Sequence, residues 1–316
     1  MDRVTIQSHA RIHAALINES GYMGRIDGGI GFAIDEPKWE ICVGRDISNS
    51  KLNVDLEFEN EIEKLKSRFI ARFKLPDFTI TIPTKIESHI GLGSKTALLL
   101  GIGKATSKLF ELGLSPSEIA IEAKRGGTSG VGYWASQKGG VVWDAGRRFP
   151  RDKSTFLPSS YSSSRPPKLI TSFDLNDYYI CHFRYAKKGV FGKVELAIFK
   201  DNCPLSHDST RELLSVISGV LVPSLLSSCD DGVQLALKSI QELGMKKIEW
   251  SHQDSETLKF KKYWESLDTN IALGLSSMGP TMYCLTKKPE RIKKIISKYP
   301  FKPIHYYQSQ IVNGQK

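Results

Sequence analysis

The sequence contains few cysteines and no closely spaced cysteine pair. Its 316 residues include five cysteines, and none of them belongs to a Cys-x-x-Cys pair. Disulfide-stapled domains and zinc modules place cysteines in even numbers or at short fixed spacings. The cysteine pattern therefore argues against both classes of protein. We expect buried thiols at Cys42, Cys181, Cys203, Cys229 and Cys284.

The sequence also lacks a long hydrophobic run. No stretch of about 18 consecutive apolar residues occurs, which a membrane-spanning helix would need. The first residues, Met1 to Arg3, lead into a polar strand rather than an apolar signal sequence. Hydrophobic residues make up 40% of the chain, which is enough for real cores. We therefore expect a cytoplasmic protein that has no membrane partner.

Basic residues are numerous but are not concentrated in one stripe. The chain has 44 lysines and arginines against 34 acidic residues, a formal net charge of +10. The lysines are spread over helical patterns such as residues 287–298, without interleaved aromatic residues. This distribution favours a solvated surface over a nucleic-acid partner. A positive field of this kind would also attract anionic phosphate substrates.

Two glycine-rich segments are the most informative feature that is present. The first is GLGSKT at 91–96, which opens an apolar helix pattern, and the second is RGGTSGVG at 125–132. Glycines ahead of a helix let backbone N–H groups close on an anion, and the positive end of the helix dipole faces the same space. We predict that phosphate is bound by Gly91, Gly93, Ser94, Lys95, Thr96, Gly126, Gly127, Thr128, Ser129 and Gly130.

The first glycine segment does not match either of the common phosphate fingerprints. A Walker loop needs Gly-x-x-x-x-Gly-Lys-Ser/Thr, and a dinucleotide fold needs a third glycine three residues after Gly93. Lys95 is therefore not a P-loop lysine, and its side chain either reaches a phosphate or points to solvent. A tight helix-entry turn without a ligand is the alternative for the whole segment.

The pattern of elements predicts an α+β chain of two domains. Residues 151–168 are rich in proline and serine, so we expect a linker there between an N-terminal domain at 1–150 and a C-terminal domain at 169–316. The expected strands are Val4–His9, Ile12–Asn18, Gly31–Ile34, Trp39–Val43, Ile80–Ile86, Tyr179–Tyr185 and Lys193–Phe199. The expected helices are Glu59–Phe73, one whose apolar stripe runs from Leu98 to Leu112, Pro116–Lys124, Ser209–Leu226 with a kink at Pro223, Gly232–Leu243, and one that begins at Pro289.

Several strings together resemble the GHMP kinase superfamily. They are SHARIH at 8–13, the two glycine segments, and a third small-residue loop, GLSSMGP, at 274–280. With GRIDGGIG at 24–31 they resemble β-ribofuranosylaminobenzene 5′-phosphate synthases more than any kinase. The resemblance covers the whole chain. It implies an N-terminal ribosomal-protein-S5-domain-2-like domain, a ferredoxin-like C-terminal domain and a homodimer.

The sequence departs from both groups at a few positions. Gly132 stands where many kinases have the aspartate that takes the acceptor proton, and Lys95 replaces a serine that helps to hold magnesium. Both losses weaken a phosphoryl-transfer interpretation. Lys95 and Ala97 also depart from the synthase pattern, where a small residue and a glutamine are usual. The second departure puts the identity of the substrate in doubt more than the fold.

The resemblance implies a pentosyltransferase of methanopterin biosynthesis. Such an enzyme condenses phosphoribosyl pyrophosphate with 4-aminobenzoate or 4-hydroxybenzoate, and releases pyrophosphate and carbon dioxide to leave a C-riboside. Magnesium is the expected companion of pyrophosphate, with Asp27 and Asp144 as candidate ligands that serve equally well as turn or cap residues. The alternatives are an ATP-dependent small-molecule kinase of the same superfamily and a non-catalytic ligand-binding module on the same fold.

Four residues of the N-terminal strings are predicted to act in catalysis or substrate contact. The planar forks of Arg11 and Arg25 suit a carboxylate or a phosphate. His13 lies on the same strand face as Arg11, where it serves as a proton shuttle or a satisfied core histidine. Asp27 completes the set, and a structural ion pair between Arg25 and Asp27 is the alternative for both.

Overall fold

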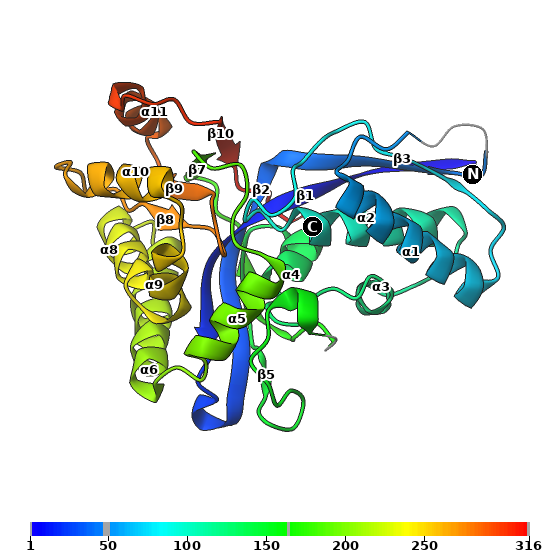
Figure 1. Ribbon diagram of the computed structural model, residues 1–316, viewed down its shortest axis with the longest axis horizontal. Helices are drawn as coiled ribbons and strands as arrows, with labels where there is room; N and C mark the ends of the chain where they lie inside the picture. Colours follow the sequence, from blue (N-terminus) through cyan, green and yellow to red (C-terminus); the bar gives the residue numbers. More distant parts are fainter. Residues whose placement is uncertain (1, 47–50, 163–164, 315–316) are drawn as a thin grey trace.

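The chain folds around two antiparallel sheets. The computed structural model describes residues 2–46, 51–162 and 165–314. The first sheet has the order β1-β2-β4-β6, with β3 and β5 also paired to β2, and the second has the order β10-β7-β9-β8. Figure 1 shows helices α1 to α3 near one end of the long β1–β2 pair and α6 to α10 beside the other. The α+β class expected from the sequence is confirmed.

The first sheet is dominated by two long strands, β1 (Arg3–Asn18) and β2 (Arg25–Gly44). The sequence predicted four separate strands here. His9 pairs with Lys38, and the next paired residue, Arg11, lies opposite Ala33. The extra residues of β2 between these two pairs form a bulge, and the strand continues beyond it. Shorter strands complete the sheet: β3 (Thr79–Thr81), β4 (Val141–Asp144), β5 (Arg147–Arg148) and β6 (Leu169–Phe173).

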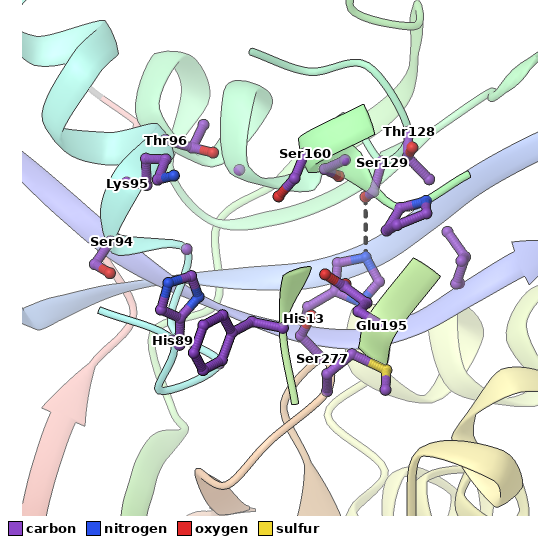
Figure 2. A pocket seen from close by; sticks show the side chains of 18 of the residues that line it. His13, His89, Ser94, Lys95, Thr96, Thr128, Ser129, Ser160, Glu195 and Ser277 are labelled. Atoms are coloured by element: carbon purple, nitrogen blue, oxygen red, sulfur yellow. Dashed lines mark hydrogen bonds between the residues drawn. The ribbon is translucent and has the colours of Figure 1, made fainter. Parts of the chain in front are cut away.

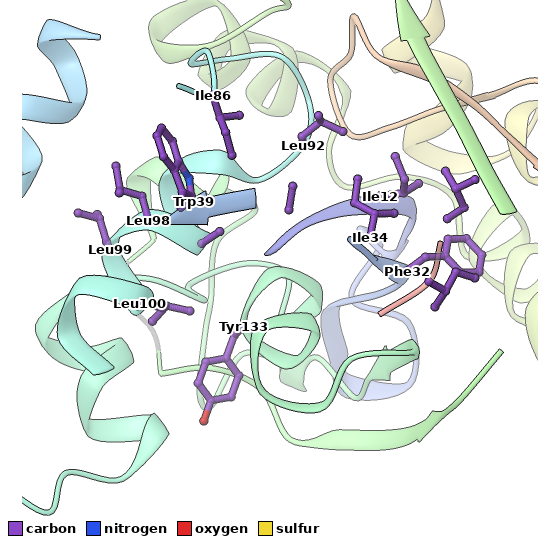
Figure 3. Packing of buried hydrophobic residues seen from close by; sticks show 14 of the residues in the cluster. Ile12, Phe32, Ile34, Trp39, Ile86, Leu92, Leu98, Leu99, Leu100 and Tyr133 are labelled. Carbon is purple, nitrogen blue, oxygen red and sulfur yellow. The ribbon is translucent and has the colours of Figure 1, made fainter. Parts of the chain in front are cut away.

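Helices cover one face of this sheet and bury its apolar side chains. They are α1 (Leu56–Phe73), α2 (Ser94–Leu109), α3 (Pro116–Glu122) and α4 (Val131–Lys138). Trp39 of β2 lies in the core beside Leu98 of α2 (Figure 3), and its indole N–H donates to the carbonyl of Ser94 at 3.0 Å. α3 begins with the capping box that Ser115 and Glu118 predicted. These contacts fix the start of α2 against the sheet.

The second half of the chain adds four strands and most of the remaining helices. The strands are β7 (Tyr179–Arg184), β8 (Gly274–Leu275), β9 (Met282–Thr286) and β10 (His305–Gln310). The helices are α5 (Gly192–Asn202), α6 (His207–Val216), α7 (Val222–Leu226), α8 (Asp230–Gln241), α9 (Gly244–Ser251), α10 (Ser255–Glu265) and α11 (Pro289–Lys298). The strand predicted at Lys193–Phe199 is wrong, because this segment is α5.

The helix predicted at Ser209–Leu226 is irregular rather than simply kinked. A π-helical turn at Ile217–Leu221 separates α6 from α7, just before Pro223. By length and composition this 20-residue segment, His207–Leu226, would be able to cross a membrane. Leu213, Ile217 and Leu221 are nevertheless buried in the main core, and core helices meet the same criterion.

The described residues of the expected linker, 151–162 and 165–168, include Ser162, Pro166 and Pro167, which pack against glycines of the second loop, and residues 163 and 164 lie outside the described part of the chain. Residues 159–161 form a short 3-10 helix, and β6, which follows the linker, pairs with β4 in the first sheet. The buried thiols expected from the sequence are found only at Cys181 and Cys284, whereas Cys229 is exposed.

Candidate functional site

Three glycine-containing loops from distant parts of the sequence meet at one cavity. Its lining includes residues of the first loop (91–96), the second loop (126–132) and the third loop (277–279). Ser276, at the start of the third loop, donates its hydroxyl to the carbonyl of Gly91 at 2.8 Å. The same hydroxyl accepts the backbone N–H of His13 at 3.0 Å. The third loop therefore joins β1 to the first glycine loop.

The first loop needs its glycines for conformation and for space. Gly91 and Gly93 have φ of +84° and +68°, values that side chains other than glycine rarely adopt. A Cβ on Gly91 would lie only 2.4 Å from the carbonyl oxygen of Ser276. α2 begins directly after Gly93, so its N-terminal N–H groups and positive dipole end lie at the cavity. An anion is the ligand that suits this end of the cavity.

Arg11 supports the first loop from β1. Its guanidinium donates to the carbonyl of Gly91 at 2.6 Å, and a Cβ on Gly93 would lie 3.1 Å from the guanidinium carbon. The pKa of Arg11 is lowered to about 10, mainly by burial; the charge of Glu249 opposes this shift and that of Arg125 adds to it. Arg11 thus stays protonated at neutral pH and places a positive charge beside the loop.

Lys95 is held at the rim of the cavity by an ion pair. Its ammonium lies 2.6 Å from a carboxylate oxygen of Glu57, and 21% of its side chain is exposed. The other carboxylate oxygen of Glu57 bonds to His89, whose ring stacks on Phe191 with centroids 3.8 Å apart. The side chain of Lys95 therefore contacts Glu57. The sequence had offered only a phosphate contact or exposure to solvent.

The second loop brings a serine against His13. Figure 2 shows the bond between the Ser129 hydroxyl and the Nε2 of His13, at 2.9 Å. Burial lowers the pKa of His13 well below its usual range, and the charges of Arg11 and Lys246 act in the same direction. The imidazole is therefore neutral at neutral pH. The neutral ring and the hydroxyl are held together by this bond at the cavity wall, where they can orient a hydroxyl group of a ligand.

Arg125 presents an open guanidinium to the cavity. Its Nε donates to the hydroxyl of Thr96 at 3.0 Å, which ties the second loop to the start of α2. Within the described parts of the chain no ion pair engages its two terminal nitrogens. Its nearest acidic neighbours act only through their charge. A guanidinium in this state is suited to bind a phosphate.

Asp27 lies behind the second loop rather than in the cavity. One of its oxygens is 2.6 Å from Arg147 and the other is 2.7 Å from Lys153, and its side chain is fully buried. Arg147 also donates to the carbonyls of Gly126 and Thr128. This buried cluster fixes the shape of the second loop, and Asp27 holds the two cations.

Asp144 supports the same loop from β4. Its two oxygens accept the backbone N–H groups of Gly130 and Gly146, at 2.8 and 2.9 Å. Burial raises the pKa of its carboxyl to about 7, against the effect of these two bonds. Because the oxygens of both Asp27 and Asp144 have protein donors, neither aspartate fits a magnesium site. Among the described residues no group of three His, Cys, Asp or Glu side chains is placed to hold a metal ion.

The structure brings together most, but not all, of the predicted site residues. Arg25 donates to the carbonyl of Ala145 and lies outside the cavity, and so do Asp27, Gly127 and Gly130. A Cβ on Gly127 or Gly130 would strike Ser162 or Pro167, so these two glycines allow close packing. The predicted residues that do line the cavity are Arg11, His13, Gly91, Gly93, Ser94, Lys95, Thr96, Gly126, Thr128 and Ser129.

Comparisons with known proteins agree with this geometry. Residues 60–135 match the family described as GHMP kinases N terminal domain. A β-ribofuranosylphenol 5′-phosphate synthase of Archaeoglobus fulgidus is 34% identical over 89% of this chain and 87% of its own length. One of Methanocaldococcus jannaschii is 32% identical, over 93% and 94% respectively. The chain belongs to the β-ribofuranosylphenol 5′-phosphate synthase family.

The synthase family shares its fold with small-molecule kinases. A mevalonate kinase of L. major aligns with a TM-score of 0.69 over 98% of this chain and 96% of its own length, at 13% identity. A phosphomevalonate kinase of Streptococcus pneumoniae aligns with a TM-score of 0.67 over 98% and 100%, at 12% identity. At such identities the likeness shows the fold alone. The resemblance read from the glycine strings is confirmed.

In the GRIDGGIG string of this synthase-family chain, the glycines at 29 and 31 matter because they have no side chain. A Cβ on Gly29 would lie 2.7 Å from the Ser129 hydroxyl, and one on Gly31 would lie 2.6 Å from Val131. Glycines at these positions of β2 therefore let the second loop and α4 approach the sheet. This explains the string without a direct contact to a substrate.

Several cavity residues were not predicted from the sequence. Glu195 and Phe199 belong to α5, which was predicted as a strand, and Glu249 belongs to α9, which was not predicted. Ser159 and Ser160 come from the expected linker. The spacing of Glu195, Ile198 and Phe199 is that of one helix face and was the signal that would have found α5.

Proposed function

We propose that this protein joins the ribose of phosphoribosyl pyrophosphate to the ring of 4-hydroxybenzoate or 4-aminobenzoate, with loss of pyrophosphate and carbon dioxide. The product is a C-riboside phosphate of the kind that the names of its relatives specify. The observation that carries the proposal is the cavity, where two glycine loops and Arg125 converge on the start of α2. A highly charged phosphate donor is the ligand that this combination suits best.

The cavity residues would act first on the departing pyrophosphate. Backbone N–H groups at the start of α2 and the guanidinium of Arg125 would neutralise the charge that develops as the bond from ribose to pyrophosphate breaks. Arg11 would hold the first loop in place and add a second positive charge. His13 and Ser129 lie close enough together to orient the ribose hydroxyls.

A kinase would need a carboxylate to take the proton of its acceptor hydroxyl. The second loop offers Gly132 at the position where the kinases carry that aspartate, and Asp144 and Asp27 face away from the cavity. Glu195 does line the cavity, but it belongs to α5 and not to the second loop. The lack of the loop aspartate favours ribosyl transfer over phosphoryl transfer.

Magnesium remains part of the proposal as the companion of pyrophosphate. Magnesium in phosphate sites keeps several waters and takes much of its coordination from substrate oxygens. Since Asp27 and Asp144 do not fit, we assign no protein ligand to it. Removal of magnesium with EDTA should abolish turnover, and readdition of magnesium should restore it.

The experiment that tests the proposal measures pyrophosphate release. The protein is incubated with phosphoribosyl pyrophosphate and magnesium, with and without each aromatic acid, and ATP consumption on candidate alcohols is measured in parallel. We expect release only when an aromatic acid is present, and no ATP consumption. ATP consumption without acceptor-dependent pyrophosphate release would contradict the proposed function.

A further inference from the structure

The cavity has two chemically different walls. One is formed by the first and second glycine loops and by Arg125 and carries N–H groups and positive charge. The other is formed by α5 and its surroundings, and its apolar side chains are Leu16, Val190, Phe191, Phe199 and Met278. Phe199 and Met278 belong to one buried apolar cluster with Leu16. An aromatic ring is better accommodated on this second wall than among the anion-binding groups.

Glu195 is the carboxylate that α5 adds to the apolar wall. Within the described residues no hydrogen bond or ion pair engages its carboxylate, whereas Glu249 is paired with Lys246 and Glu57 is paired with Lys95. Figure 2 shows Glu195 among the side chains that line the cavity, close to His13 and Ser277 in this view. A half-buried acidic group that has no such interaction among the described residues is available for chemistry.

The surroundings of Glu195 favour proton transfer near neutral pH. The pKa of its carboxyl is raised to about 7, mainly by burial and also by the charge of Glu249, while Arg125 opposes the shift. The other titratable groups that line the cavity are Arg11, His13, His89 and Lys95. A base whose pKa lies near the working pH is the most effective kind.

We propose that the α5 wall is the subsite for the acceptor ring, and that Glu195 takes the phenolic proton of a 4-hydroxybenzoate-type acceptor. The proposal rests on the proposed function and adds to it the place of the acceptor and a catalytic base. With the ring on the apolar wall, its reacting carbon can face the ribose held at the opposite wall.

Glu195 takes one proton and returns it within a single turnover, so the reaction needs no net proton transfer to the protein. As Glu195 takes the phenolic proton, the oxygen lone pair moves into the ring, and the ring carbon that bears the carboxylate forms a bond to C1 of ribose. The bond from C1 to pyrophosphate breaks, and its electron pair leaves with pyrophosphate. The carboxylate then leaves as carbon dioxide, its bonding electrons restore the aromatic ring, and Glu195 returns the proton to the phenolate.

An arylamine acceptor does not need this base. The neutral nitrogen of 4-aminobenzoate can donate its lone pair to the ring and carry a positive charge as an iminium. Loss of carbon dioxide then neutralises that charge without any proton transfer. The two acceptors therefore separate a role of Glu195 as a base from a role in binding or folding.

The test compares Glu195→Gln with the unmutated protein on both acceptors. We expect kcat with 4-hydroxybenzoate to fall by about 100-fold or more, the usual contribution of a general base. With 4-aminobenzoate we expect kcat to change by less than about threefold, because no proton transfer is needed. Val194→Ala is the control on the same helix, since Val194 is 60% exposed and lies outside the cavity.

The pH profile gives a second readout. For the unmutated protein, kcat with 4-hydroxybenzoate should rise as the pH passes through the pKa of Glu195, about 7, and this rise should be absent in Glu195→Gln. An equal loss on both acceptors, a loss that more magnesium restores, or no loss at all would overturn the proposal. If the unmutated protein releases pyrophosphate with neither acceptor, the proposed function itself is wrong.

Discussion

At the scale of single residues, the role of a charge in this site follows from its partners. Among the described residues, the guanidinium of Arg125 has one hydrogen bond, to Thr96, and the residue lines the cavity. Lys95 is bound to Glu57, and Arg147 is enclosed by Asp27 and by loop carbonyls. Three basic residues near the same loops therefore differ in role. Arg125 is free to bind an anion, Lys95 is held in an ion pair at the edge of the cavity, and Arg147 supports the second loop. Sequence alone distinguished none of them.

The open guanidinium of Arg125 leads to the first prediction. Arg125→Gln should raise the KM for phosphoribosyl pyrophosphate by about tenfold or more, equivalent to roughly 1.4 kcal/mol, because one charged donor to phosphate is lost. Steady-state kinetics and a thermal melt measure the effect, and the melting temperature should change little. Arg151→Gln, an exposed change of the same charge, is the control. An unchanged KM would remove Arg125 from the donor site.

Glu19 leads to a prediction on stability against pH. Its carboxylate oxygens are buried and have no hydrogen-bond partner among the described residues. Burial raises the pKa of Glu19 well above its ordinary 4.5, the charges of Asp27 and Glu249 act in the same direction, and Lys153 and Arg147 oppose them. The folded state thus keeps a proton that the unfolded state loses as the pH rises above about 4.5. Native stability should fall over that range.

Glu19→Gln removes this proton linkage. Compared with the unmutated protein, the variant should gain stability between pH 5 and pH 8, by up to about 1.4 kcal/mol per pH unit. Urea unfolding at the two pH values measures the difference. Glu40→Gln, at an exposed position of β2, should show no such trend. A constant difference between Glu19→Gln and the parent would mean that Glu19 is ionised in the fold.

At the scale of elements, the sequence predicted correctly those features that depend on interactions between residues close together in the chain. The capping box of α3 and the glycine loop before α2 were read correctly, because short-range hydrogen bonds and glycine conformations define them. The bulge that joins the two halves of β2 and the identity of α5 depend on tertiary packing. In α5 a short alternating pattern matched a strand, but the adjacent Ile198 and Phe199 are both buried. That arrangement suits a helix face and not a strand.

The buried cluster behind the second loop leads to a prediction at this scale. Asp27→Asn leaves Arg147 and Lys153 without their shared carboxylate, and a broken buried ion pair costs about 3–5 kcal/mol. The unfolding free energy in urea should fall accordingly, and activity should fall with it because the second loop loses its support. Asp152→Asn, which breaks the exposed pair with Arg148, should change stability little. Equal effects of the two variants would contradict the supporting role of Asp27.

At the scale of the whole molecule, the site is assembled from three loops that the fold brings together. Ser276 bonds to Gly91 and to the backbone of His13. The third loop is thus joined to residues that lie more than half of the chain away in sequence. The sequence predicted the loops but could not predict which of their residues face inward. Gly127 and Gly130 allow close packing, and Arg25 donates to the carbonyl of Ala145, although all three have the chemistry expected of a phosphate site. The same fold that carries phosphoryl transfer in kinases here lacks an aspartate at Gly132.

The most direct test of the account follows the carboxyl carbon of the acceptor. The protein would be incubated with phosphoribosyl pyrophosphate, magnesium and 4-hydroxybenzoate or 4-aminobenzoate labelled with carbon-13 in the carboxyl group. The account predicts labelled carbon dioxide and pyrophosphate in equal amounts, and an unlabelled product in which ribose is bonded to the ring carbon. A product that keeps the label, or pyrophosphate release without labelled carbon dioxide, would contradict it.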